Sequence, residues 1–380
     1  MEKRLYTTVA ILGVILLFLS LQILSVHTQT TASENPIDIS EEVPESLDML
    51  LFISPQYSKD IEILDAVNNY IESVQKDIGW NSEIIPVTTE ENDYLKIDLI
   101  IEHYYNSYDL KACIMVGEDI NTPLAGDSDY QEKPSTIPWS TIGGPQVYDS
   151  SDQGVVCKPY TTKLCISLLF PTQTLDFQTK KSQLISAFKK FSERRHDFEL
   201  EKVLVAESSD INVNSKDIYQ NIDANTDLIY LENPTDSEIF SFTKSPYSIF
   251  LIHGHSNPSG TLINRENVWF SANNVDELNT PIFGADGCYV NGWWSQCQDN
   301  DKLDSSINGT YYATKIFSSE NIRVMALGLL SQNGYSYPVS FIENSLPDIL
   351  EGKTVAESII NKNCLGDTVI IGDPTFHFTQ

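Results

Sequence analysis

The chain alternates between short apolar runs and longer segments in which apolar residues recur every three or four positions. Short apolar runs are typical of buried strands, and the three- to four-residue spacing is typical of helices. The first such series predicts strands at 47–54, 81–88 and 111–119 and helices at 59–79 and 92–108. Strands that alternate with helices form a parallel sheet with helices packed on its faces.

After a polar, loop-like segment at 120–155, the first series continues with a strand at 163–171 and a helix at 180–196. A second series predicts strands at 201–208, 226–232, 246–255, 280–288, 322–332 and 367–378, and one helix that covers 345–363 from about Leu346. The predicted fold class is therefore α/β, with two α/β subdomains on mostly parallel central sheets flanked by helices. We place the first subdomain at 47–196 and the second at 197–380.

The first 46 residues differ in composition from the rest of the chain. A positively charged start, "MEKR", precedes an almost unbroken apolar run at 5–26, and polar residues follow it. This is the pattern of a secretory signal peptide or an N-terminal membrane anchor. The run of about 22 residues is close to the roughly 20 that a helix needs to span a bilayer. We assign 1–32 to this segment and 33–46 to a linker, so the remainder is expected outside the cell, secreted or anchored at the outer face of the membrane.

The charge of the chain excludes one broad class of function. With 53 acidic and 24 basic residues the formal net charge is −29. Such a chain repels the phosphate backbone, so nucleic acid is not expected as a partner. Two acid-rich stretches, 127–132 and 298–304, do not match the ligand spacing of a known calcium loop. We therefore predict no cofactor and no metal ligand, and leave a structural calcium ion open.

The cysteine count fits an exported protein. The six cysteines contain no Cys-X-X-Cys pair, which argues against a zinc site. Disulfides are common in exported chains, and Cys157 and Cys165 are near enough in sequence to pair across a turn.

Two predicted strands end in residues that can carry chemistry. His253 and His255 follow the apolar run "IFLI", and Cys288 ends the run "TPIFGADGC". Ligands of parallel sheets bind beyond the carboxyl ends of the strands, so imidazole and thiol would meet there if the two strands were neighbours. The imidazole can take the proton of the thiol, and the thiolate can then attack a carbonyl carbon. The adjacent Gly254 and Gly287 would let backbone N–H groups approach the resulting oxyanion.

The residues alone leave other interpretations open. Cysteine is among the most often buried residue types, and most buried cysteines are inert. His253 and His255 could bind a metal ion as a pair, and Ser256 could act as nucleophile, although no nucleophile elbow surrounds it. Trp293 and Trp294, which follow Cys288, either form an apolar wall for a substrate or pack beneath their loop.

Four stretches of the sequence together resemble one family of enzymes. They are "FLIHGHSNPSG", "LNTPIFGADGCYVNGWW", "LEGKTVAESII" and "VIIGDPTFHF". Their order is similar to that of the gingipain family, in the caspase, legumain and gingipain clan of cysteine peptidases. The resemblance covers roughly residues 47–380. It implies a caspase-like fold, a Cys–His dyad in the second subdomain with Cys288 as nucleophile, and hydrolysis of peptide bonds through a thioester.

The resemblance leaves the choice of the basic histidine open. His253 is followed by glycine, as in the His-Gly pattern of the clan. His255 is instead preceded by glycine, as the histidine of the family is, and the alignment of the residues that follow it slightly favours His255. The helper acid and the specificity pocket of the family cannot be assigned to residues here. We expect an exported cysteine endopeptidase that acts on proteins or peptides; the alternative is a catalytically weak relative that binds peptides at a surface.

Overall fold

The computed structural model describes residues 46–122, 124–125, 133–134, 136–142, 148–149, 156–157, 160–172, 175–193, 195, 198–200, 202–209, 227–257, 259–264, 268–288, 311–330, 340–364 and 367–379. The signal or anchor expected at 1–32 and nearly all of the linker at 33–46 therefore lie outside the described residues, as do the two acid-rich stretches. No helix among the described residues is long and apolar enough to span a bilayer.

One sheet of ten strands forms the centre of the fold, in the order β11-β10-β12-β16-β17-β19-β9-β3-β1-β2. In chain order, the first four strands of this sheet are β1 (Met49–Ile53), β2 (Ser82–Pro86), β3 (Ala112–Val116) and β9 (Cys165–Leu169). The others are β10 (Lys202–Glu207), β11 (Asp227–Glu232), β12 (Ile249–His253), β16 (Ile282–Cys288), β17 (Val324–Leu330) and β19 (Asp367–Gly372). Every pair of neighbours is parallel except β17 and β19. The predicted fold class is confirmed.

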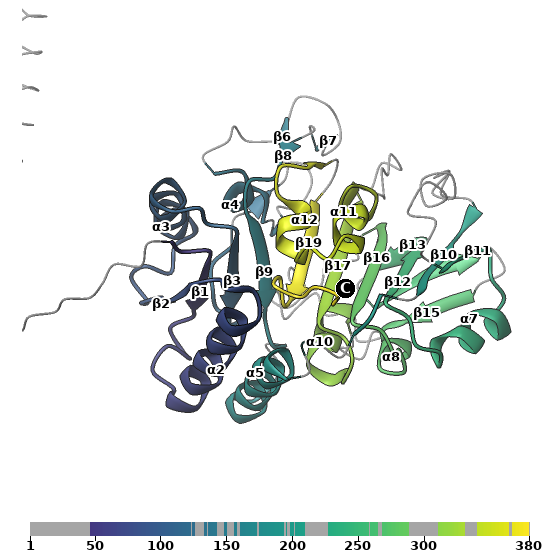
Figure 1. The fold of residues 1–380 in the computed structure, drawn as a ribbon, viewed down its shortest axis with the longest axis horizontal. Helices are drawn as coiled ribbons and strands as arrows, with labels where there is room; N and C mark the ends of the chain where they lie inside the picture. The colour runs from purple at the N-terminus through teal and green to yellow at the C-terminus, as the bar shows by residue number, and fades with distance from the viewer. Residues whose placement is uncertain are drawn as a thin grey trace, which may run out of the picture. The chain divides into compact units, whose positions relative to one another are not determined.

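Helices cover both faces of this sheet, as Figure 1 shows, with α2, α5 and α10 on one side and α3, α4, α11 and α12 on the other. Their bounds are α2 Ile61–Ile78, α3 Tyr94–Ser107, α4 Ile137–Thr141, α5 Phe177–Ser192, α7 Asp236–Thr243, α8 Ala272–Val275, α10 Lys315–Ser318, α11 Ser340–Leu350 and α12 Val355–Ile359. One 3-10 turn spans Tyr312–Thr314.

Helix α2 illustrates why these segments fold as they do. The Asp60 side chain accepts hydrogen bonds from the first-turn N–H groups, and Gly79 ends the helix at φ 76, a conformation that favours glycine. The buried side chains of the helix follow helical spacing and pack against the sheet; they are Ile63, Val67, Tyr70 and Val74.

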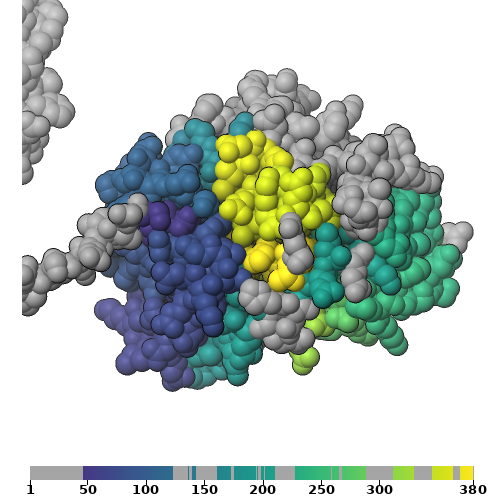
Figure 2. Space-filling view, viewed as in Figure 1, coloured from purple at the N-terminus to yellow at the C-terminus, as the bar shows by residue number. Residues whose placement is uncertain are grey.

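The last strand joins the two halves of the sheet. β19 pairs with β17 on one side and with β9 on the other, so the strands of both predicted subdomains belong to one sheet. Figure 2 shows the last residues of the chain (yellow) between the blue surface of the first half and the green surface of the second. Because β19 is antiparallel to β17, the strands of the two halves end at opposite edges of the sheet. The boundary at residue 196 stays a prediction.

Three local expectations need correction. The segment 345–363 is not one helix: α11 contains Pro347, Gly352 follows it at φ 84, and Thr354 caps a separate helix, α12. The strand expected at 246–255 breaks at Gly254. Cys165 is a free, buried thiol in β9, so it does not pair with Cys157.

Small strands complete the described residues. In the segment expected to be a loop, β4 (Leu124–Ala125) pairs with β5 (Lys133–Pro134), and β6 (Tyr148–Asp149) pairs with β7 (Val156–Cys157). A further pair consists of β8 (Tyr160–Thr161) and β18 (Asn363–Cys364). A three-stranded antiparallel sheet, which the sequence did not predict, consists of β13 (His255–Asn257), β14 (Gly260–Asn264) and β15 (Val268–Ser271).

Candidate active site

The strands that end in His253 and Cys288 are neighbours, which is the condition that the predicted dyad requires. β12 and β16 run parallel, with Ile252 opposite Ala285 and His253 opposite Asp286. β12 ends at His253, Gly254 interrupts the strand and His255 begins β13, whereas β16 continues two residues beyond Asp286 to Cys288. The topology therefore brings both histidines and the cysteine to one edge of the sheet.

Backbone contacts at Gly287 support this register. A Cβ atom at Gly287 would lie 2.4 Å from the carbonyl oxygen of Gly254 and 1.9 Å from the Ser256 hydroxyl. The segment around His255 therefore runs directly beside the end of β16. Only glycine leaves the space for this approach, which explains why Gly287 precedes Cys288. The Ser256 hydroxyl donates to the Gly254 carbonyl oxygen at 3.0 Å, so it serves the turn.

The two predicted oxyanion glycines differ in what their backbones do. The N–H of Gly254 donates to the carbonyl oxygen of Asp286 at 3.1 Å and so continues the hydrogen-bond ladder of the sheet. An N–H that is used in this way does not face a substrate, so this geometry does not support the oxyanion role of Gly254. The oxyanion role of Gly287 stays a prediction.

The two histidines lie in different environments. The side chain of His253 is 0 % exposed, and its Nδ1 lies 3.4 Å from Oδ2 of Asp286. His255, two residues later, is exposed to solvent. A substrate can reach the imidazole of His255 directly, whereas that of His253 lies beneath the surface.

A buried row of ionisable side chains crosses the sheet below this edge. Glu207 on β10 is in register with His253, which is in register with Asp286 on β16. Glu207 and Asp286 are only 2 % and 4 % exposed. The Tyr230 hydroxyl donates to Glu207 at 2.7 Å, and Asp286 fits beside β17 because Gly328 carries no Cβ atom, which would lie 2.0 Å from its Oδ1.

Burial controls the titration of both carboxyl groups in this row. It raises the pKa of Asp286, and the nearby His253 opposes the rise only in part. Burial also raises the pKa of Glu207, against the hydrogen bond from Tyr230 and the charge of His253. Carboxyl groups with raised pKa values beside an imidazole are typical of functional sites, although structural networks also produce them.

Sequence reasoning missed this row, yet one signal for it was present. Asp286 is an acid two residues before Cys288 in an otherwise apolar strand, and Glu207 is an acid at the end of the apolar run "KVLVA". Acids are rarely fully buried without a partner. Each acid in such a run therefore indicated a buried polar partner on a neighbouring strand.

Other predicted positions are not brought into the site. Trp293 and Trp294 lie outside the described residues. The described parts of the chain contain no group of three or more metal-ligating side chains. Cys113 and Cys165 are buried in adjacent strands, and burial raises the pKa of both thiols, so neither is an activated nucleophile.

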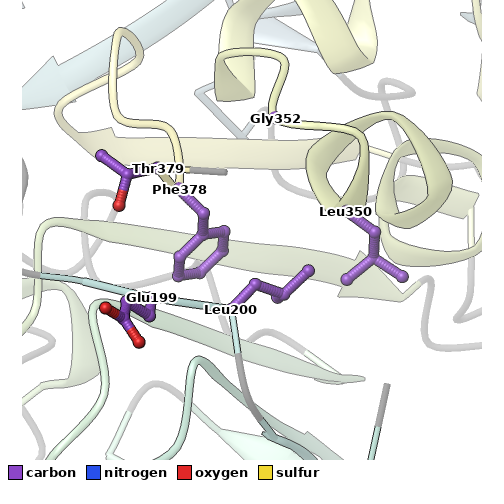
Figure 3. Close-up of a pocket in the computed structure, with 6 residues that line it drawn as sticks. All are labelled: Glu199, Leu200, Leu350, Gly352, Phe378 and Thr379. Carbon is purple, nitrogen blue, oxygen red and sulfur yellow. The ribbon is translucent and has the colours of Figure 1, made fainter. Parts of the chain in front are cut away.

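A pocket of about 290 Å³ lies elsewhere on the molecule, lined by Glu199, Leu200, Leu350, Gly352, Phe378 and Thr379. Figure 3 shows the side chains of Leu200 and Phe378 close together on one side and Leu350 across from them. Leu200 precedes β10 and Phe378 follows β19, which places the pocket at the edge of the sheet opposite Cys288. None of the predicted catalytic residues lines it.

Comparison with solved structures identifies the fold. The structure of the Arg-specific cysteine proteinase gingipain R matches with a TM-score of 0.58 and 14% identity, over 88% of this chain and 78% of that one. The complex of the pro- and mature domains of RgpB from Porphyromonas gingivalis matches at 0.56 and 14%, over 87% and 79%. A third structure, of a protease, matches at 0.58 and 11%, over 87% and 78%.

The chain therefore has the gingipain-like cysteine peptidase fold. At this level of identity the likeness concerns the fold alone. No family model matches the sequence, and no curated protein matches it.

Proposed function

We propose that this chain is an exported cysteine endopeptidase in which Cys288 is the nucleophile and His255 is the base. The observation that carries the proposal is the parallel pairing of β12 with β16: β16 ends in Cys288, and the exposed His255 follows the last residue of β12 by two positions. The gingipain-like fold supports the same arrangement, because two of the matched structures are of a cysteine proteinase and its pro-domain complex.

The chemistry follows from the two side chains. The imidazole of His255 takes the proton of the Cys288 thiol, and the thiolate attacks the carbonyl carbon of a peptide bond. The resulting oxyanion collapses, the C–N bond breaks, and the imidazolium gives its proton to the leaving amine. Water activated by the same imidazole then hydrolyses the thioester and restores the thiol.

His253 is better suited to a supporting role than to proton transfer. Its side chain is fully buried and lies against Asp286, two residues before the nucleophile. A buried imidazole and a buried carboxyl group in adjacent strands fix the spacing of those strands where they end. We assign His253 and Asp286 to positioning of the site.

Export is inferred from the sequence, and the substrate class is inferred from the fold. The apolar run at 5–26 favours secretion or anchoring at the outer face of the membrane. Protein or peptide substrates are inferred from the proteinase fold. None of the described residues supports a preference for a particular side chain at the bond that is cut, so the Arg specificity of gingipain R is not extended to this chain.

Alkylation of the purified protein with iodoacetamide between pH 5 and pH 9, with mass-spectrometric mapping of each cysteine, tests this proposal. We expect Cys288 to react rapidly already near pH 6, as a thiolate paired with imidazole does. The buried Cys113 and Cys165 are internal controls and should stay unmodified in the folded protein.

Peptide hydrolysis by the Cys288→Ala and Cys288→Ser variants completes the test. Both should fold as the parent protein does and lose turnover. Turnover that survives in Cys288→Ala, or a Cys288 that reacts only above about pH 8 like an ordinary thiol, would contradict the proposal and favour the peptide-binding alternative.

A further inference from the structure

His255 belongs to the small antiparallel sheet of β13, β14 and β15, and its side chain is one of a row. The register pairs His255 with Leu262 and pairs Leu262 with Trp269. Directly opposite residues of neighbouring strands point to the same face of a sheet. His255, Leu262 and Trp269 therefore share one face, and β13 lies beside the end of β16, where a Cβ atom at Gly287 would meet Gly254 and Ser256.

The two faces of this small sheet differ sharply. The alternate residues Ser256, Thr261 and Phe270 face inward, and Phe270 stacks on Phe250 of the main sheet with ring centroids 5.6 Å apart. The outward face leaves Trp269 39% exposed, although a large aromatic side chain gains free energy from burial. The small sheet is thus fixed to the main sheet by one face and presents an indole on the other.

The indole of Trp269 is held in position. A Cβ atom at Gly260 would lie 2.4 Å from both Nε1 and Cε2 of the ring, so the indole lies against the backbone of Gly260. A ring fixed in this way loses little conformational freedom when a ligand contacts it.

The chemistry of peptide hydrolysis determines which residues of a substrate lie over this face. The thiolate bonds to the acyl carbon, while the imidazole must reach the nitrogen that leaves. The substrate residues that follow the scissile bond therefore begin at His255. From His255 the row continues across β14 and β15 to Leu262 and Trp269.

We propose that Leu262 and Trp269 bind an apolar side chain of the substrate on the leaving-group side of the scissile bond. The proposal rests on the proposed function, because it takes His255 as the base. Neighbouring strands lie about 4.8 Å apart, so Trp269, two strands away, lies roughly 10 Å from His255. About three residues of an extended peptide, at ~3.3 Å each, span this distance. The bound side chain is therefore that of the second or third residue after the scissile bond.

The test compares full-length protein with its Trp269→Ala and Trp269→Phe variants on two kinds of substrate. One is a peptide series with a single phenylalanine moved through the first four positions after the scissile bond, with glycine elsewhere on that side. The other carries the same acyl part and only a coumarin amide as leaving group. Leu99→Ala is the matched control, because Leu99 is an exposed apolar residue (64%) on α3.

We expect Trp269→Ala to lower kcat/KM about tenfold for phenylalanine at the second or third position, as the loss of one apolar contact area does. The same variant should change coumarin-amide hydrolysis less than twofold, and Trp269→Phe should restore most of the loss. Equal losses on both substrates, an effect only at the first position, or a similar loss in Leu99→Ala would overturn the proposal.

A binding measurement separates this proposal from the proposed function. Calorimetry with the leaving-side product peptide Gly-Phe-Phe-Gly amide and its all-glycine analogue needs no turnover. Weaker binding of the phenylalanine peptide to Trp269→Ala supports the apolar site even if the protein hydrolyses nothing. Equal binding of the two peptides to the parent protein, or a parent dimer that Trp269→Ala dissociates, would show that this face does not serve the substrate.

Discussion

Among the residues that the structure describes, two buried clusters of charged side chains shift the pKa values of their acids in opposite directions. In the first, Arg195 pairs with Asp77 at 2.6 Å and with Asp373 at 2.9 Å. In the second, the row of Glu207, His253 and Asp286, two carboxyl groups flank one imidazole. The first cluster has the permanent cation of Arg195 between its acids, whereas the second has the imidazole of His253 between them.

The pKa values of the acids record this difference. Burial raises the pKa of Asp77, but hydrogen bonds from His377 and Arg195 outweigh it and bring the pKa to about 2. Burial raises the pKa of Asp286, and its neighbours do not overcome the rise. We infer that the first cluster stabilises the junction between α2 and the end of β19, whereas the second is placed where chemistry is proposed.

Replacement of His255 should have the largest effect, and it falls on activity. We expect His255→Ala to lower kcat/KM by about 10²- to 10⁴-fold, the usual contribution of a general base, with an unchanged melting temperature because the side chain is exposed. His103→Ala, at an exposed histidine of α3, is the matched control. If His255→Ala retains full activity while His253→Ala folds and loses it, the assignment of the base is reversed.

Replacement of Arg195 should have the largest effect on stability. Arg195→Met leaves the buried carboxylates of Asp77 and Asp373 without their cation, so we expect a loss of about 3–5 kcal/mol in the free energy of unfolding. Urea unfolding at pH 7 measures it. Under conditions where the variant is folded, kcat should match that of the parent protein. A loss of activity without loss of stability would mean that the first cluster also serves the site.

The contribution of Asp77 to the free energy of unfolding should depend on pH. Its folded-state pKa of about 2 lies below the unfolded value, so its ionised form stabilises the protein above about pH 4, and this contribution is lost as the pH falls toward 2. The shift corresponds to about 2 kcal/mol for a side chain that is only 4% exposed. Asp77→Asn should therefore cost about 2 kcal/mol at pH 7, and the cost should shrink in urea titrations below pH 4. A cost that is independent of pH would assign the effect to packing instead.

The strands and helices that the sequence predicted best are those with strong local signals. Helix α2 was expected at 59–79 from its regular apolar spacing and the glycine at its end, and the structure places it at Ile61–Ile78. The strand ending in Cys288 was also found, because its apolar run is short and bounded by a turn. Local patterns of this kind need no knowledge of neighbours.

The parts that the sequence could not predict depend on contacts between distant segments. The small sheet of β13, β14 and β15 has no strong apolar run; packing of Phe270 against Phe250 holds it on the main sheet. The partnership of His253 with Asp286 depends on which strands are neighbours and in what register. Gly287 could be read as a conformational feature, but only the structure shows that Ser256 occupies the space of its missing Cβ.

Replacement of Asp286 should give the smallest effect, with a pH dependence opposite to that of Asp77. Because burial raises its folded-state pKa, the parent protein loses stability as the pH rises and this carboxyl group ionises. Asp286→Asn removes that charge and nearly keeps the shape, so we expect a change of about 1 kcal/mol or less where the carboxyl group is protonated, and a relative gain in stability as the pH rises above the ordinary pKa of aspartate, about 4. The pair Asp77→Asn and Asp286→Asn, unfolded in urea across the same pH range, should therefore diverge. Parallel curves for the two variants would remove the distinction between the clusters, because both acids would then be ionised and compensated in the same way.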